Sequence, residues 1–127
     1  AQARGIKVVA AVGNDGPAAP PQYPASRPGV IAVTGVDSTN RALAEAGKAL
    51  HLDYSAPGAD MAAAMPGKGY TIVRGTSFAA PLVSARLALT GSTARLDAEA
   101  SKKGFGQIGR GIVCGPCRVP PKKVGAK

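Results

Sequence analysis

The sequence predicts an α/β fold built around a mostly parallel sheet. Its continuous apolar runs, of which Val30-Ile31-Ala32-Val33 is the clearest, are typical of strands buried on both faces, as strands of parallel sheets are. A second apolar run, Leu82 to Leu89, is apolar nearly all round and predicts a helix that passes through an interior. Aromatic residues make up only 4% of the chain and Trp is absent. Small aliphatic residues must therefore build the core, which suits close packing of helices on a sheet.

The first part of the chain is expected to contain two strands separated by a long loop. Residues Ala1 to Gly5 read as the end of a helix with a glycine cap. We expect a strand at Ile6 to Val12 and a second strand at Val30 to Val36, with a loop rich in Pro and Gly between them. The polar stretch Asp37 to Lys48 then predicts another connection.

The second part of the chain is expected to alternate short strands with helices. An alternating run predicts a strand near Leu50 to Tyr54, and Gly91-Ser92-Thr93 interrupts the long helix. The other expected elements, in chain order, are a short apolar run at Met61 to Met65, a strand at Tyr70 to Arg74, a helix from Ser77 to about Thr90, and a short helix at Leu96 to Ala100 that precedes Lys102 and Lys103.

A hydroxyl group lies where a loop is expected to meet the long helix. Proline fits a helix best in the first turn or so, since it has no N–H and clashes with the carbonyl four residues earlier. Pro81 therefore predicts that the helix begins close to Ser77. Free backbone N–H groups at that end favour developing negative charge, as on the oxyanion of acyl transfer. Ser77 is therefore a candidate nucleophile.

Four blocks of the sequence, in a fixed order, resemble the subtilisin-like serine proteases. The heptad Gly75-Thr76-Ser77-Phe78-Ala79-Ala80-Pro81 matches the nucleophile motif Gly-Thr-Ser-x-Ala-x-Pro of that family without a gap. The other blocks are Val8-Val9-Ala10-Ala11-Val12-Gly13-Asn14-Asp15-Gly16, Tyr23-Pro24-Ala25 with Val30-Ile31-Ala32-Val33, and Tyr54-Ser55-Ala56-Pro57-Gly58. The resemblance covers about residues 1 to 90 and, more weakly, the tail to about Pro120.

This resemblance implies a serine endopeptidase that acts on polypeptides. It implies a subtilisin-like three-layer fold with a mostly parallel sheet, of which only the C-terminal portion is present. By the same resemblance Ser77 is the nucleophile, and Asn14 and the Ser77 N–H form the oxyanion hole. Taken singly, Ser77 also fits a helix N-cap, and Asn14 before Asp15-Gly16 also fits a turn.

The resemblance also implies where the substrate binds. Ala11, Val12 and Gly13 should form one wall of the pocket for the residue that precedes the scissile bond, with Gln22 near its floor. Gly75 and Thr76, directly before the nucleophile, complete the expected substrate-binding set.

The Asp and His motifs of the family's catalytic triad are not found in this sequence. In the family they precede the Ser in the order Asp, His, Ser, whereas His51, the single histidine, follows the Asn14 block. We interpret His51 as a partly exposed strand residue and expect no local triad with Asp53. The catalytic Asp and His are expected in a missing N-terminal half of the same domain. The alternative is a catalytically inactive, truncated homologue that acts, if at all, as a binding module.

The positive charge of the chain is concentrated in its tail. The net charge is +9 overall, of which +4 falls in residues 1–95 and +5 in residues 96–127. We therefore expect two parts, the protease-like portion 1–95 and a short helix with a basic Gly/Pro-rich tail at 96–127. Aromatic residues for base stacking are almost lacking. The tail is accordingly interpreted as a solvated terminus, and no nucleic-acid partner is expected.

The tail also contains the tetrapeptide Cys114-Gly115-Pro116-Cys117. Redox motifs of this spacing precede a helix, but Arg118-Val119-Pro120-Pro121 follows here and disfavours a regular helix. Two Cys and one distant His cannot complete a zinc site. The two cysteines are expected to form a small disulfide loop or to remain free thiols. A disulfide would favour a secreted or periplasmic location.

No cofactor is expected from the sequence. Some members of the family bind calcium through loop carbonyls, but no cluster of carboxylates here requires it. No apolar stretch reaches the ~18 residues that a membrane-spanning helix needs.

Overall fold

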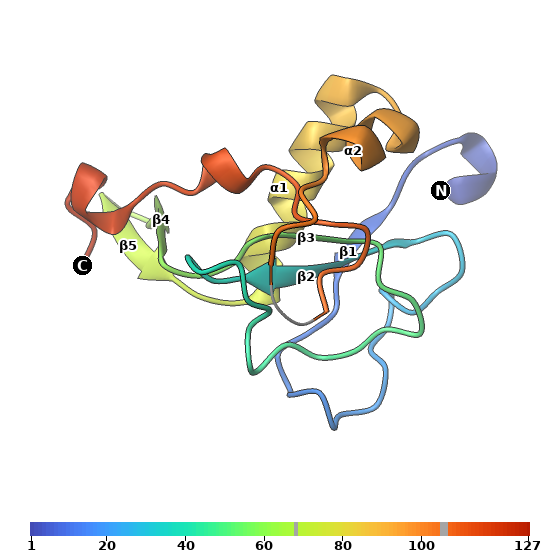
Figure 1. Ribbon diagram of the computed structural model, residues 1–127, viewed down its shortest axis with the longest axis horizontal. Coiled ribbons are helices and arrows are strands. Elements are labelled where there is room, and N and C mark those ends of the chain that lie inside the picture. The colour runs from blue at the N-terminus through green and yellow to red at the C-terminus, as the bar shows by residue number, and fades with distance from the viewer. Residues whose placement is uncertain (68, 105–106) are drawn as a thin grey trace.

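A parallel three-stranded sheet forms the centre of the molecule (Figure 1). The computed structural model describes residues 1–67, 69–104 and 107–127. The strands lie in the order β1 (Val9–Ala11), β2 (Ile31–Val36) and β3 (Tyr54–Pro57), with Val9 beside Ile31 and Val33 beside Tyr54. Every residue of β2 and β3 is buried. The prediction of an α/β fold with a mostly parallel sheet is confirmed.

Helices α1 (Thr76–Thr90) and α2 (Thr93–Glu99) pack on one side of this sheet, and the long connecting loops lie on the other (Figure 1). Ala79, Val83 and Leu87 of α1 belong to the main hydrophobic cluster. The opposite side of α1 is open, with Leu89 76% exposed. The helix was expected to pass through an interior. That expectation is wrong for this chain, because among the described residues only one face of α1 packs against the sheet.

Two of the predicted strands differ from the observed ones by more than one residue at an end. Strand β1 is shorter than the expected Ile6 to Val12, and Ile6 is 55% exposed. Strand β3 begins at Tyr54, where the run Leu50 to Tyr54 was expected to end. The alternation before β3 has another cause, since His51 and Asp53 contact the start of β2 with their side chains.

The expected glycine cap near the N-terminus and the expected strand at Tyr70 to Arg74 agree with the structure more closely. A 3-10 helix, η1 (Gln2–Arg4), ends at Gly5 in the left-handed conformation with φ 76°, as a glycine cap requires. Strands β4 (Met61–Ala64) and β5 (Tyr70–Val73) form a separate antiparallel hairpin. Strand β5 ends one residue before the predicted Arg74 and leads directly into α1.

The tail was interpreted as a solvated terminus, but residues 111–114 within it are buried. Helix α2 begins at Thr93, three residues before the predicted Leu96, because the Ser92 hydroxyl caps it. Residues 111–113 run parallel to β3: the Ser55 N–H donates to Gly111, and the Val113 N–H donates to Ser55. Val113 is fully buried. Residues 105–106 of the tail lie outside the described residues.

The C-terminal residues pack against the hairpin, as Figure 1 shows beside β4 and β5. Two further 3-10 helices, η2 (Gly115–Cys117) and η3 (Pro121–Val124), carry the chain there. The Ala62 N–H of β4 donates to Val119, and the Ile72 N–H of β5 donates to Lys127. Within the described residues, no helix has both the length and the apolar character needed to cross a membrane.

Candidate active site

Ser77 is the second residue of α1 and is exposed. The helix begins at Thr76, one residue before the predicted start, and Gly75 is its N-cap, with φ 146°. Pro81 lies in the second turn and has no N–H to donate to the Ser77 carbonyl. The Ser77 N–H is one of the first four of the helix, which have no acceptor within the helix itself. The nucleophile candidate therefore combines an accessible hydroxyl with a helix N-terminus.

The side chain of Asn14 is attached to this same helix end. Its Oδ1 accepts a hydrogen bond from the Thr76 N–H at 2.9 Å. The Thr76 hydroxyl lies 3.2 Å from the same oxygen and 3.1 Å from the Gly13 carbonyl. Because Oδ1 faces Thr76, the Nδ2 donor of Asn14 faces away from it. The structure thus brings Asn14 to the residue next to Ser77.

Gly75 lies next to the Asn14 amide in a backbone conformation that favours glycine. A Cβ on Gly75 would lie 3.4 Å from Asn14 Nδ2, and the φ of 146° at Gly75 disfavours any other residue there. The Gly75 N–H donates to the Gly58 carbonyl at 2.8 Å. A Cβ on Gly58 would lie 2.9 Å from both the Gly75 oxygen and the Gly35 Cα. Gly58, at the end of β3, is therefore a structural part of the site whose role sequence reasoning did not identify.

The expected substrate-binding residues lie next to Asn14. Gly13, with φ 91°, packs against Gln22, whose Cγ would lie 3.1 Å from a Cβ on Gly13. The Val12 side chain is buried in a small cluster with Ala25 and Ala32, so only its backbone is available to a ligand. Ala11 ends β1 and is partly buried. Gln22 thus lies beside Gly13.

Sequence reasoning missed an ion pair beside the site. Arg74, the residue before Gly75, donates from Nε and NH2 to the two carboxylate oxygens of Glu45 at 2.6 and 2.9 Å. Hydrogen bonding from Arg74 holds the pKa of Glu45 below its usual value, and the same bond raises the pKa of Arg74. Sequence spacing cannot reveal this pair, because its members are 29 residues apart.

His51 and Asp53 lie away from the site. His51 is partly exposed, as expected, but the prediction that it lies in a strand is wrong, because β3 begins only at Tyr54. His51 Nε2 is 2.7 Å from the Val30 carbonyl, and Asp53 accepts a hydrogen bond from the Ala32 N–H at 2.8 Å. Both contacts are with the N-terminal end of β2. Asn14, in contrast, follows the C-terminal end of β1.

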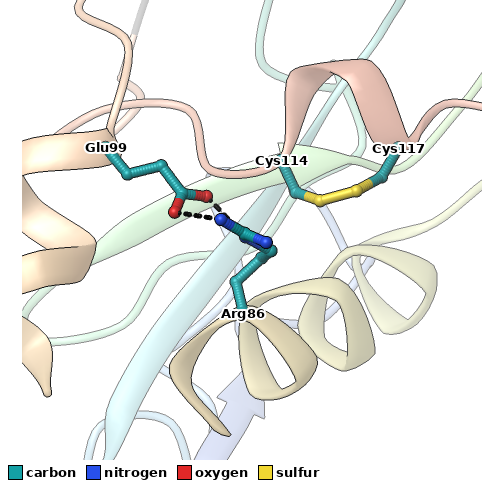
Figure 2. Close-up of a disulfide and its surroundings, with 4 residues drawn as sticks. All are labelled: Arg86, Glu99, Cys114 and Cys117. Atoms are coloured by element: carbon teal, nitrogen blue, oxygen red, sulfur yellow. Dashed lines mark hydrogen bonds and ion pairs between the residues drawn. A yellow bond between two sulfur atoms is a disulfide. The ribbon is translucent and has the colours of Figure 1, made fainter. Parts of the chain in front are cut away.

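Cys114 and Cys117 form a disulfide with a Cα–Cα distance of 5.2 Å. Figure 2 shows it beside an ion pair between Arg86 of α1 and Glu99 of α2, whose closest atoms are 2.6 Å apart. Of the two expectations for these cysteines, the disulfide is the one observed. In the part of the chain that the structure describes, no three His, Cys, Asp or Glu side chains are grouped to hold a metal ion.

Comparison with known proteins identifies the family. The model of the subtilase family, peptidase S8, matches residues 1–102. The chain belongs to the subtilase family. The match spans the segment that contains both Asn14 and Ser77.

Individual relatives agree with the family match. Over 88 residues the chain is 39% identical to subtilisin E of Bacillus subtilis (strain 168), covering 67% of this chain and 23% of that protein. It is equally similar to a subtilisin of Bacillus pumilus, of which it covers 32%. The solved structure of the prenylagaramide maturation protease PagA is also similar, with a TM-score of 0.68 and 27% identity. The match covers 88% of this chain and 49% of the PagA chain. The chain thus spans a minor part of these relatives and carries a subtilisin-like fold.

Proposed function

We propose that this chain is part of a serine endopeptidase that cleaves polypeptides through an acyl-enzyme on Ser77. The observation that carries the proposal is the hydrogen bond from the Thr76 N–H to Asn14 Oδ1. It fixes the Asn14 amide next to the nucleophile candidate, with Nδ2 turned away from Thr76 as a free donor. Membership of the subtilase family supports the same assignment.

In the proposed reaction, Ser77 Oγ attacks the scissile carbonyl carbon and gives its proton to a histidine. The carbonyl oxygen becomes an oxyanion, which the Ser77 N–H and Asn14 Nδ2 stabilise by hydrogen bonding. The tetrahedral intermediate collapses to an acyl-enzyme as the leaving amine takes the proton from the histidine. Water then hydrolyses the ester and restores Ser77. The histidine and its aspartate partner are supplied by the polypeptide upstream of residue 1.

The proposed substrate pocket consists of the Ala11-Val12-Gly13 backbone and Gln22. The contact between Gln22 and Gly13 supports this grouping. We further propose a secreted or periplasmic protein, supported by the Cys114–Cys117 disulfide. The proposed mechanism needs no cofactor.

The test compares two purified proteins, residues 1–127 alone and the polypeptide extended upstream to include the Asp and His motifs. Loss of the histidine from a subtilisin triad lowers turnover by about 10⁶-fold, a magnitude taken from subtilisin itself. We therefore expect the extended protein to cleave a chromogenic peptide and the 127-residue chain to show no appreciable cleavage. Absence of cleavage by an extended protein that contains both motifs would favour the alternative, a non-catalytic binding module.

A further inference from the structure

Two loops meet at the N-terminus of α1, next to Ser77, and one segment of the chain contacts both. The first loop carries Gly13 and Asn14, and the second carries Gly75 into α1. The segment 43–47 lies between them. Its Gly47 N–H donates to the Gly13 carbonyl at 2.8 Å, and its Glu45 carbonyl accepts from the Gly16 N–H at 2.9 Å. Backbone hydrogen bonds therefore attach this segment to the Asn14 loop on both sides of Asn14.

The same segment reaches the second loop through one side chain. The Glu45 carboxylate accepts two hydrogen bonds from Arg74, at 2.6 and 2.9 Å. Such a two-point contact between planar groups restrains orientation as well as distance. Arg74 directly precedes Gly75, whose backbone is freer than that of other residues. The ion pair thus restrains the residue that leads into Gly75 and the start of α1.

The segment 43–47 is itself firmly anchored. Leu43 and Ala46 are buried with Ala59 in a separate small cluster. The Leu43 N–H donates to the Gly35 carbonyl of β2 at 3.0 Å. Glu45 therefore lies on a segment that is fixed to the core, and its carboxylate holds the Arg74 side chain in place.

We propose that Glu45 and Arg74 are positioning residues for the oxyanion hole. The pair keeps the Gly75–Ser77 backbone aligned with the Asn14 amide, so that both oxyanion donors point at one oxygen. This inference rests on the proposed function, since it assigns the pair a role in that reaction. Neither side chain touches the reacting atoms. The pair acts through Gly75 and Asn14.

The chain offers a matched control pair. Arg86 and Glu99 also form a two-point ion pair, at 2.8 and 2.6 Å. Their side chains are 35% and 25% exposed, against 52% and 33% for Arg74 and Glu45. The control pair joins α1 to α2 and does not contact either loop of the site. Replacing its arginine removes the same charge and the same kind of contact.

The experiment uses the extended protein and the variants Arg74→Gln, Glu45→Gln and Arg86→Gln. Because small displacements of catalytic groups cost much of the rate, we expect kcat to fall by about five- to tenfold in the first two variants, with KM within about twofold. Labelling of Ser77 by a fluorophosphonate should slow by a similar factor. Arg86→Gln should change neither quantity. The exchanged pair Glu45→Arg with Arg74→Glu should recover at least half of the lost kcat.

Hydrogen exchange at the Thr76 amide separates this proposal from the proposed function. That N–H is held by Asn14, so its exchange should accelerate in Arg74→Gln and stay unchanged in Arg86→Gln. Equal exchange, kcat and labelling in these two variants would overturn the positioning role, even if Ser77 is the nucleophile. If the unaltered extended protein is not labelled at all, the proposed function fails, and the exchange rates alone decide whether the pair aligns the two loops.

Discussion

Asn14 Oδ1 accepts a hydrogen bond from the backbone N–H of Thr76, 62 residues further along the chain. The first N–H groups of a helix lack partners within the helix, and here a side chain from another loop satisfies one of them. The contact also fixes the orientation of the amide, since Oδ1 must face Thr76. Asn14 therefore has two separable tasks: its oxygen attaches the loop to α1, and its nitrogen is free to donate.

Two substitutions at position 14 should separate these tasks in the extended protein. Asn14→Ala removes both the acceptor and the donor, whereas Asn14→Asp keeps an acceptor for Thr76 and removes the donor. We expect both to lower kcat by about 10²- to 10³-fold with KM little changed, a magnitude borrowed from subtilisin, where one such donor was removed. Only Asn14→Ala should also accelerate hydrogen exchange at Thr76. A rise in KM with kcat unchanged would contradict the oxyanion role.

Gly58 should tolerate a methyl group far less well than Gly115. A Cβ at Gly58 would lie 2.9 Å from two backbone atoms, which cannot move aside as a flexible side chain can, while a Cβ at Gly115 meets nothing within 4 Å. We expect Gly58→Ala to lower the free energy of unfolding by about 1 to 3 kcal/mol. Gly115→Ala should stay within about 0.5 kcal/mol of the unaltered protein. Urea unfolding measures both, and equal stabilities would contradict the close contact of Gly58 with Gly75.

Tyr54 should ionise at unusually high pH. Burial, followed by the hydrogen bond to Asp97, raises its pKa to about 12. The usual value is 10.0, so unfolded chains lose the proton first. The stabilisation from neutral Tyr54 is therefore complete below about pH 10 and is lost as the pH rises toward 12. Absorbance titration should show a tyrosine step near pH 12 that Tyr54→Phe abolishes and Asp97→Asn moves to lower pH. A titration curve unchanged by Tyr54→Phe would refute this.

Residues 111–113 should contribute to stability as core residues do. Val113 is fully buried, whereas Val119 is 38% exposed. We expect Val113→Ala to cost about 2 kcal/mol of unfolding free energy and Val119→Ala less than about 0.5 kcal/mol. Chemical unfolding of the two variants measures this. Similar small losses in both would show that the tail is dispensable for the fold.

The sequence predicted the features that depend on local chemistry. The buried run at Val30 predicted β2 because a parallel strand is apolar on both faces. The start of α1 was predicted to within one residue, because Pro81 and the motif around Ser77 restrict where a helix can begin. The resemblance to the subtilases predicted the family.

Features that depend on distant partners could not be predicted in this way. The alternation near Leu50 indicated a strand, but His51 and Asp53 instead direct their side chains at β2. The basic tail looked solvated because its Gly, Pro and Lys residues carry no periodic pattern, yet residues 111–113 pair with β3. The contact between Arg74 and Glu45 is likewise set by the fold and not by spacing in the sequence.

The most direct test of the account is covalent labelling of the extended protein with a serine-directed fluorophosphonate, followed by peptide mass spectrometry. We predict a single labelled residue, Ser77, with slower labelling in Asn14→Ala. Ser77→Ala should not be labelled, because it lacks the nucleophilic oxygen. Labelling at another serine, or labelling that persists in Ser77→Ala, would contradict the assignment of Ser77 as the nucleophile.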